Sequence, residues 1–364
     1  MASTRAAKKP KCDDKFKVAV VDLRDPDAAL RFTDSLKSTG FAVLTNHPVP
    51  SDLITGVYSE WRDFMIKLHT AAAASRRSDA ASSPTNLADK YYHKRSTQDG
   101  YFPMAVSEQA KGAKVKDLKH YFQLYFPHGQ YPRDEVSTAA EDLFGELIGL
   151  GKTLVQWIDD HMPPEIRATI QEKIGEGRTL SECISDERTM LRVLHYPGYA
   201  QDTQEQGAVR AAAHEDINLI TVLPAGSARG LQVLSKQSGE WYEVPLVEGS
   251  IIINIGDMMQ EMSDHAYIST THRVIKMDED KPKSVASGED SDGSVDLFGM
   301  HDRMSTPCFI HLKRKCPLSE AYGSAEHYLL ERLVTLGVKP RTELDEFLKQ
   351  YPGGVMPLWD PAVE

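Results

Sequence analysis

Hydrophobic and polar residues follow two different periods along the chain, and the first half mostly has the period of helices. Apolar side chains recur every three or four positions from Val136 to Trp157, which predicts a six-turn helix that Pro163 and Pro164 end. The same spacing predicts helices from Asp27 to Ser38 and from about Ser51 to Ala74. We therefore expect the first half to supply helices that cover an apolar core.

From Met190 onward the pattern changes to short apolar runs separated by glycine and proline, which predicts strands. These runs are Leu191–Tyr196, Leu219–Leu223, Leu231–Leu234, Ile251–Ile255, Thr270–Ile275 and Pro307–Leu312. Two earlier runs, Lys17–Leu23 and Phe41–Leu44, also fit buried strands. Many short strands with frequent turn signals are typical of a β-sandwich or barrel. The expected fold is a β-rich core with flanking helices.

Two segments outside the chain ends lack either period. The alanine- and serine-rich residues 71–86 indicate a surface loop, and residues 278–296, with seven acidic side chains, indicate a surface insertion of unknown role. We divide the chain into a disordered lead (1–15), an amino-terminal region whose helices and strands join the core (16–185), the core itself (186–320), and a carboxy-terminal helix and tail (321–364).

Composition and charge narrow the class of protein. Of 364 residues, 41% are hydrophobic and 26% charged, which suits a folded chain, and no apolar run reaches the roughly 18 residues of a membrane span. The net charge of −11 is opposite to that of most nucleic-acid binders. Four scattered cysteines and a basic amino terminus without an apolar core favour a cytoplasmic protein, although a targeting segment stays possible. We expect a monomer that binds neither nucleic acid nor membrane.

The sharpest chemical signal is His214-Glu215-Asp216, followed 58 residues later by His272. On a strand, His214 and Asp216 would point the same way, and His272 could approach from a facing strand. Two imidazoles and one carboxylate on one face leave positions open on a metal, which is the signature of non-haem Fe(II) oxygenases. The triplet alone is weak evidence, because a strand histidine is more often a hydrogen-bonded core residue. A zinc hydrolase also stays open.

A second signal is Arg303-Met304-Ser305, at the start of the run that ends at Leu312. Arg303 and Ser305 should share a face of this strand, and a guanidinium matches a carboxylate through two parallel hydrogen bonds. Such a pair could anchor the far end of a dicarboxylate. Tyr196 could add its hydroxyl, although a core tyrosine before a turn proline is an equal alternative.

Seven motifs follow the order that they have in a known family. They are Gly40–His47, Leu194–Pro197, His214–Asp216, Gly230–Val233, Asn254–Asp257, Ser269–Val274 and Arg303–Ser305. Together they span most of the chain, which resembles the isopenicillin N synthase-like branch of the 2-oxoglutarate and Fe(II)-dependent dioxygenases. One departure is Leu194, where plant members often have asparagine. Another is the gap of 31 residues between His272 and Arg303, which the insertion explains.

The resemblance implies an oxidoreductase with a distorted double-stranded β-helix (a cupin-like jelly roll) as its core. It implies that His214, Asp216 and His272 hold Fe(II), and that 2-oxoglutarate is anchored by Arg303, Ser305 and Tyr196. The expected reaction consumes O₂ and 2-oxoglutarate, releases succinate and CO₂, and hydroxylates a small molecule. Desaturation, cyclisation and ring expansion use the same oxidant and stay open.

The substrate cannot be identified from the sequence. Four residues near the metal motifs are candidates to line its pocket: Arg192, Asn218, Phe309 and Tyr101. Arg192 could favour an acidic small molecule, although a strand arginine is more often structural. Two further alternatives are an iron oxidase of the same fold that needs no 2-oxoglutarate and a binding protein without catalysis.

Overall fold

The strands of both halves of the chain pair into one large sheet. The computed structural model describes residues 16–75, 86–104, 106, 119–197, 209–226, 229–275, 302–357 and 359–362. In spatial order, the sheet holds β1 (Ala19–Asp22), β2 (Phe41–Thr45), β10 (Ile251–Ile255), β7 (Ile220–Pro224), β13 (Cys308–Leu312), β5 (Ile184–Tyr196), β4 (His120–Tyr125) and β3 (Gly100–Phe102). β12 (Arg303–Ser305) also pairs with β5. Only β1 and β2 run parallel among these described strands.

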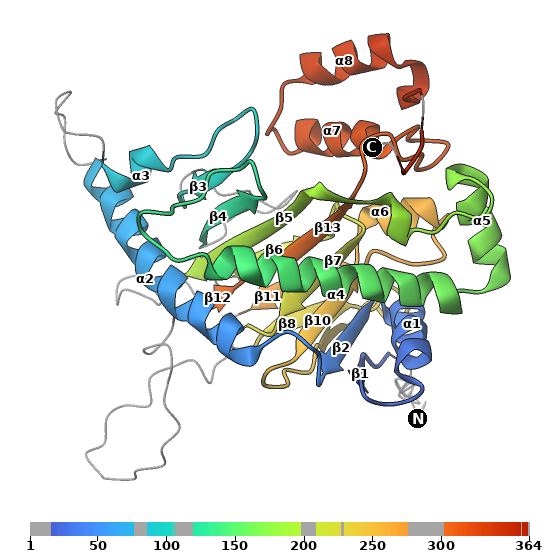
Figure 1. Cartoon of the computed structure of the whole chain (residues 1–364), viewed down its shortest axis with the longest axis horizontal. Coiled ribbons are helices and arrows are strands. Elements are labelled where there is room, and N and C mark those ends of the chain that lie inside the picture. The colour runs from blue at the N-terminus through green and yellow to red at the C-terminus, as the bar shows by residue number, and fades with distance from the viewer. Residues whose placement is uncertain are drawn as a thin grey trace, which may run out of the picture.

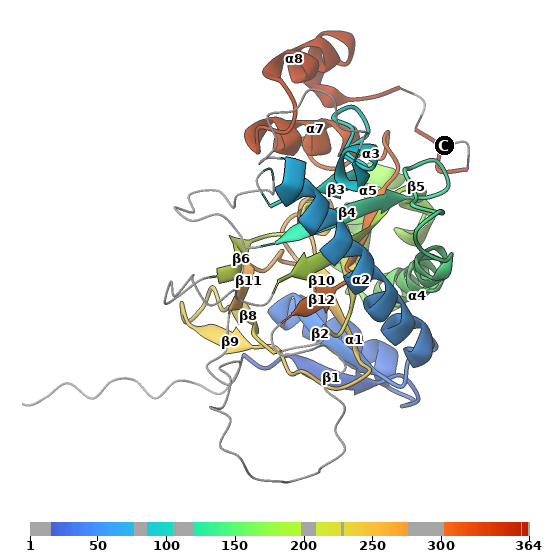
Figure 2. The same cartoon turned by 90° about the vertical axis from the view of Figure 1, so that its left-hand side faces the viewer.

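A smaller sheet faces the large one. Its order is β6 (Val209–His214), β11 (His272–Ile275), β8 (Leu231–Leu234) and β9 (Trp241–Glu243), and all of its described pairs are antiparallel. Figure 2 shows this sheet on one side of the large sheet, with α2 (Ser51–Ser75) and α4 (Ala139–His161) on the other. The molecule therefore has three layers: the small sheet, the large sheet and the helices. Side chains from both sheets point into the space between them.

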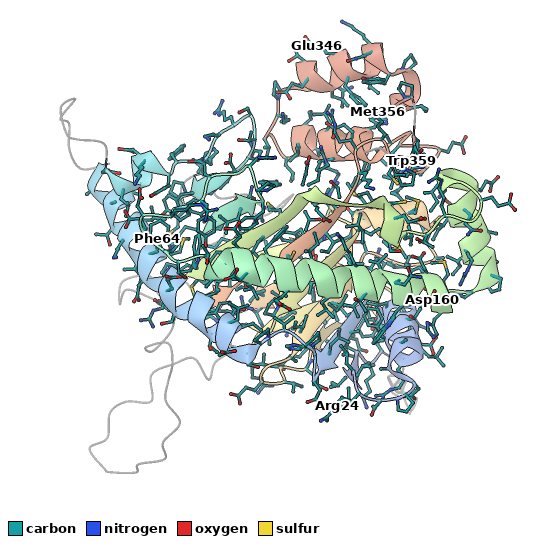
Figure 3. The ribbon with its side chains drawn as sticks, in the orientation of Figure 1. Arg24, Phe64, Asp160, Glu346, Met356 and Trp359 are labelled. Atoms are coloured by element: carbon teal, nitrogen blue, oxygen red, sulfur yellow. The ribbon has the colours of Figure 1, made fainter. Side chains whose placement is uncertain are left out.

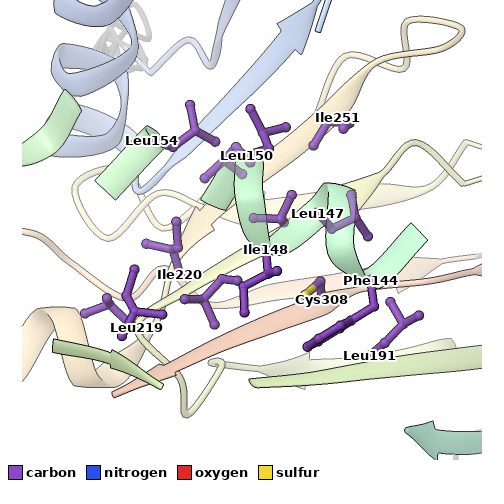
Figure 4. Packing of buried hydrophobic residues seen from close by; sticks show 14 of the residues in the cluster. Phe144, Leu147, Ile148, Leu150, Leu154, Leu191, Leu219, Ile220, Ile251 and Cys308 are labelled. Atoms are coloured by element: carbon purple, nitrogen blue, oxygen red, sulfur yellow. The ribbon is translucent and has the colours of Figure 1, made fainter. Parts of the chain in front are cut away.

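Helix α4 covers the outer face of the large sheet (Figure 1). Its apolar residues point at the strands in Figure 4, where Phe144, Leu147, Ile148, Leu150 and Leu154 meet Leu191, Leu219, Ile220, Ile251 and Cys308. A Cβ at Gly151 would lie 2.9 Å from Cδ1 of Ile310, so the glycine allows this close approach. The helix ends at Met162, before Pro163, as its sequence pattern predicts.

The remaining helices lie around this core. They are α1 (Ala28–Thr39), α3 (Leu87–Lys90), α5 (Pro164–Ile174), α6 (Asp257–Met262), α7 (Ala325–Thr335), α8 (Arg341–Gln350) and the short 3₁₀ turns η1 (Ser181–Cys183) and η3 (Pro352–Gly354). Helix α1 ends at Gly40, whose left-handed conformation (φ 73°) lets its N–H bond back to the carbonyl of Leu36. Among the helices described, none has both the length and the apolar composition needed to cross a bilayer.

Several predicted boundaries need correction. The predicted helix to about Ala74 is confirmed, and the loop predicted from residue 71 starts too early, because the four successive alanines favour helix and α2 continues to Ser75. The run from Arg303 to Leu312 is two strands, because Pro307 has no N–H for a ladder and the chain changes partner there from β5 to β7 and β5 together. The carboxy-terminal helix is two helices, α7 and α8, separated by Gly337 (φ 72°) and Pro340.

Some expectations concern residues outside the described ranges. The lead over residues 1–15 and the insertion over 278–296 lie there, as does most of the predicted loop from residue 76 to 85. The division of the chain at residues 185 and 320 stays a prediction. Strands β1 to β4 of the first region do pair into the same sheet as strands of the predicted core.

Candidate metal and cosubstrate site

Three side chains converge where the small sheet ends. His214 is the last residue of β6, and it lies directly opposite His272, the first residue of β11. Oδ1 of Asp216 lies 3.7 Å from Nε2 of His214 and 3.8 Å from Nε2 of His272. One ligand atom from each residue therefore lies within 4.8 Å of the others, a spacing that a single metal ion could bridge.

Backbone carbonyls orient both imidazoles. Nδ1 of His214 is 2.7 Å from the carbonyl oxygen of Ala212, and Nδ1 of His272 is 3.1 Å from that of Thr270. A carbonyl only accepts, so each Nδ1 carries the proton and each Nε2 keeps a free lone pair. Both lone pairs are available on the side of Asp216. This is how proteins commonly hold histidine ligands for a divalent metal.

Asp216 is held by hydrogen bonds from the large sheet. Its Oδ2 accepts from Oγ1 of Thr221 at 2.6 Å and from Nδ2 of Asn254 at 2.9 Å. Burial raises the pKa of this carboxyl, but the two histidines and the two hydrogen bonds outweigh it and leave the pKa below its ordinary value. Asp216 is therefore an anion with Oδ1 available for a metal.

The spacing of Asp216 from His214 predicted that both lie on one strand. Asp216 instead lies beyond the end of that strand. Strand β6 ends at His214, and the carbonyl of Asp216 accepts instead from the N–H of Asp257 at 2.7 Å. The chain is crossing from the small sheet to the large one at this point, and β7 begins only at Ile220. The two side chains meet because of this crossing rather than because of strand alternation.

The second predicted cluster lies on β12 and β5. Arg303 is directly opposite Tyr196, Ser305 is opposite Leu194, and Cζ of Arg303 is 5.2 Å from the centre of the Tyr196 ring. Arg303 is only 3% exposed, yet within the described part of the chain no carboxylate pairs with it and its Nε has no hydrogen-bond partner. An unpaired buried charge is costly, so this guanidinium fits the carboxylate of a ligand.

A cavity of about 1030 Å³ leads from His214 and Asp216 to helices α7 and α8. Two of the residues predicted to contact the substrate, Arg192 and Phe309, line it. Asn218 also lines it, but Nδ2 of Asn218 donates to the carbonyl of Ile220 (2.6 Å) and its amide contacts Thr221, so Asn218 supports the residue that holds Asp216.

Tyr101 lies elsewhere. It is fully buried in the main core, and its hydroxyl contacts Nδ1 of His120 at 3.1 Å. Nε2 of His120 is hydrogen-bonded to Nδ1 of His195 (2.7 Å), and Nε2 of His195 is hydrogen-bonded to Oδ2 of Asp302 (3.1 Å). These polar residues lie next to the strand that carries Arg303, since His195 is directly opposite Met304. The sequence interpretation placed Tyr101 near the metal because strand pairing, which decides the face, is not visible in the sequence.

The cavity residues that the sequence interpretation missed include Lys119, Gln123 and His311. His311 could have been found, because it follows Phe309 by two positions in an apolar strand and should share its face. Burial, together with the nearby charge of Arg188, lowers the pKa of His311 to about 3, so its ring is neutral. Lys119 and Gln123 lie in a stretch with little pattern, and the position of Gln123 follows only from the pairing of β4 with β5.

A model of the 2OG-Fe(II) oxygenase superfamily matches residues 188–311, which include both clusters. The chain belongs to this superfamily. It is therefore an oxidoreductase whose cofactors are Fe(II) and 2-oxoglutarate, which confirms the prediction. The jelly-roll prediction is confirmed as well. The narrower isopenicillin N synthase-like branch, the cytoplasmic location and the monomeric state stay predictions.

Known relatives resemble the oxygenase over most of its length. A Shewanella oneidensis protein described as an oxygenase is 39% identical in sequence to this chain. Its crystal structure matches with a TM-score of 0.67, and the match covers 89% of this chain and 100% of that one. Flavanone 3-dioxygenase 2 of Oryza sativa subsp. japonica is 27% identical over 74% of this chain and 72% of its own. A full-length Neurospora crassa protein in complex with alpha-KG shares the fold, with a TM-score of 0.63, 19% identity, and coverage of 89% of this chain and 98% of its own.

Proposed function

We propose that His214, Asp216 and His272 hold the Fe(II) of this oxygenase. The donor set fits the ion, since it offers two neutral imidazoles and one carboxylate with an open side toward the cavity. We also propose that Arg303, Ser305 and Tyr196 anchor the distal carboxylate of 2-oxoglutarate. The observation that carries this second assignment is the buried guanidinium of Arg303, which lacks an anion among the described residues.

When bound, Fe(II) and 2-oxoglutarate activate O₂ for the oxidation of a small molecule. The chain itself contributes orientation. Thr221 and Asn254 keep Oδ1 of Asp216 facing the imidazoles, and Arg303 would hold the distal carboxylate of the cosubstrate. We propose hydroxylation as the outcome, since it needs no further group from the protein.

The proposed function is tested by anaerobic titration of the purified protein with Fe(II) and then 2-oxoglutarate. Chelation of Fe(II) by 2-oxoglutarate should give a visible charge-transfer band. Asp216→Ala should lose the band altogether, because a charged ligand of the metal is gone. Arg303→Gln should keep the band but require at least ten times more 2-oxoglutarate, since a charge-assisted bidentate contact is lost. Arg133→Gln, an exposed arginine, is the matched control.

The same experiment separates the alternatives. Binding of Fe(II) without any response to 2-oxoglutarate would favour an oxidase that uses Arg303 for the substrate's own carboxylate. Failure to bind Fe(II) would favour a non-catalytic protein, and tight binding of Zn²⁺ with hydrolytic activity would favour a hydrolase. Succinate release in air, dependent on Asp216, is the corresponding catalytic measurement.

A further inference from the structure

A row of hydrogen-bonded side chains crosses three strands of the large sheet and ends at the start of β12. It consists of Tyr101 on β3, His120 on β4, His195 on β5 and Asp302, the residue before β12. The three members on strands are at most 2% exposed. Neither the proposed metal ligands nor the proposed anchor of 2-oxoglutarate includes any of them. The row nevertheless ends at the residue next to Arg303.

The row has a single direction when its imidazoles are neutral. Burial lowers the pKa of His120 well below its ordinary value, and the nearby rings of His195 and His69 lower it further. A neutral imidazole has one N–H and one lone pair, and a carboxylate only accepts. Nε2 of His195 therefore donates to Asp302, and its Nδ1 accepts from Nε2 of His120. Nδ1 of His120 then accepts from the hydroxyl of Tyr101. A buried polar network satisfied in this way holds its members in fixed positions.

The row and the proposed anchor of 2-oxoglutarate lie on opposite faces of the sheet. Residues directly opposite each other on paired strands share a face, and neighbours along a strand alternate between faces. His195 therefore shares a face with Met304, which belongs to the main core. Arg303 and Tyr196 are paired with each other and point to the other face. The row approaches β12 from the side away from the proposed cosubstrate.

Contacts at the two ends of β12 help to fix its position, because the strand is short. It has three residues and pairs only with β5 among the described strands. At one end His195 is hydrogen-bonded to Asp302 (3.1 Å), and at the other Oγ1 of Thr306 donates to the hydroxyl of Tyr58 (3.3 Å). Thr306 is fully buried, whereas the side chain of Asp302 is 23% exposed. A change at Asp302 can therefore release one end of β12 without opening the core.

The position of Arg303 matters because a guanidinium binds a carboxylate through two parallel hydrogen bonds, whose geometry allows little displacement. We propose that Asp302 and His195 are positioning residues for the cosubstrate. Their hydrogen bond fixes the start of β12, and with it the guanidinium that binds the distal carboxylate of 2-oxoglutarate. This inference rests on the proposed role of Arg303 and specifies what holds Arg303 in place.

Asp302→Ala and Asp302→Asn separate positioning from charge. Charge alone predicts that both variants bind 2-oxoglutarate more tightly, because each removes a negative charge near the site of an anion. Positioning predicts weaker binding in the alanine variant only, since the side-chain carbonyl of asparagine can still accept from His195. Each variant is titrated anaerobically with Fe(II) and then 2-oxoglutarate. The concentration of 2-oxoglutarate for half-maximal charge-transfer absorbance should rise about three- to tenfold in Asp302→Ala, as loss of one hydrogen bond predicts. Asp302→Asn should resemble the wild type, and neither variant should change the dissociation constant for Fe(II).

Tyr101→Phe is the matched control. It removes a buried hydrogen bond from the same row but leaves the contact between His195 and Asp302 in place. The 2-oxoglutarate requirement of this variant should equal that of the wild type. His195→Leu should weaken 2-oxoglutarate binding, and adding Asp302→Ala to it should weaken binding no further, because the bond is already lost.

Four results would overturn the proposal. They are wild-type affinity for 2-oxoglutarate in Asp302→Ala, equal weakening in the alanine and asparagine variants, weaker Fe(II) binding in Asp302→Ala, and additive effects of the changes at His195 and Asp302. Additive effects would mean that Asp302 acts through a different contact. Failure of the proposed function would look different: the wild type would give no charge-transfer band, or Arg303→Gln would leave the 2-oxoglutarate requirement unchanged.

Discussion

The two carboxylate oxygens of Asp216 have different partners, and the difference explains how one loop residue can act as a reliable ligand. Oδ2 is held by Thr221 and Asn254, which belong to neighbouring strands of the large sheet, while Oδ1 faces His214 and His272. Such supporting hydrogen bonds typically change metal affinity by ten- to a hundredfold.

Thr221→Val should therefore weaken Fe(II) binding without unfolding the protein. The change removes the hydroxyl that contacts Oδ2 and leaves a side chain of similar shape, so Asp216 can rotate. We expect the dissociation constant for Fe(II), measured by anaerobic titration, to rise at least tenfold. Thr33→Val is the control, because Thr33 is equally buried but bonds to Ala29 within α1. An unchanged affinity in Thr221→Val would show that Asn254 alone suffices.

Gly226 limits the space next to Arg303. A Cβ at this position would lie 2.7 Å from Nη2 and 3.1 Å from Cζ of Arg303, so the guanidinium would have to move. Gly226→Ala should raise the concentration of 2-oxoglutarate needed for half-maximal charge-transfer absorbance several-fold and leave the Fe(II) affinity unchanged. Gly56→Ala, where the added Cβ meets nothing within 4 Å, should alter neither. Equal 2-oxoglutarate affinity in both variants would place the cosubstrate elsewhere.

His311 should make the metal-free protein sensitive to acid. Its pKa is lowered to about 3 by burial and by Arg188, whereas the unfolded chain titrates near 6.5. The unfolded state then binds the proton more readily, so stability is full above pH 6.5 and falls as the pH drops toward 3. At pH 5 this residue alone removes about 2 kcal/mol. His311→Asn should flatten the pH dependence seen in urea unfolding, and exposed His265→Asn should not.

At the scale of single residues, the spacing of motifs in the sequence identified the candidate site residues but not always what surrounds them. His214, Asp216 and His272 come together, and Arg303 lies opposite Tyr196, as expected from motifs that each carry a chemically distinctive side chain. The sequence could not show that Tyr101 lies buried against His120, because this depends on which strand β3 pairs with.

The helices α7 and α8 line the outer end of the cavity. They share a small core of their own, made of Leu330, Leu344, Phe347 and Met356. Figure 3 shows Met356 on the side of α8 that faces α7 and Glu346 on the opposite side. A separate small cluster of this kind can open without unfolding the main core.

Leu344→Ala should loosen α8 selectively. Leu344 is 1% exposed, and truncating a buried leucine costs about 2–5 kcal/mol, which exceeds what a four-residue cluster can compensate. Hydrogen exchange should accelerate over residues 341–356 and stay slow in β5, β7 and β13. Leu348→Ala, at a half-buried position on the same helix, should have a smaller effect. Uniform acceleration over the whole chain would mean that α8 belongs to the main cooperative unit.

Element boundaries were predicted well where a residue forces them. Gly40 ends α1, and Pro163 follows the end of α4. They were predicted poorly where pairing decides them. β5 extends back to Ile184, because β13 pairs with Ser185 and Ile184 again after a bulge that holds polar residues such as Asp186 and Glu187. No apolar pattern marks such an extension.

At the scale of the whole molecule, the proposed site joins the two sheets. His214 and His272 end strands of the small sheet, whereas Arg303 and Tyr196 lie on paired strands of the large one. Asp216 lies in the segment that crosses between them. Iron held by the first pair and 2-oxoglutarate held by the second would connect the sheets through the bond between ion and cosubstrate.

This arrangement predicts that Mn²⁺, as an oxygen-inert substitute for Fe(II), and 2-oxoglutarate stabilise the protein together more than the sum of their separate effects. Each ligand alone contacts mainly one sheet, whereas the two together restrain both. A ligand at a hundred times its dissociation constant adds about 2.7 kcal/mol to the free energy of unfolding. The melting temperature should therefore rise by several degrees when both are present, and by less than half of that with either one. In Asp216→Ala the joint effect should be lost, because the ion that links 2-oxoglutarate to the small sheet is no longer held. If the two separate rises in melting temperature simply add, the ligands bind independently, which would contradict a shared site.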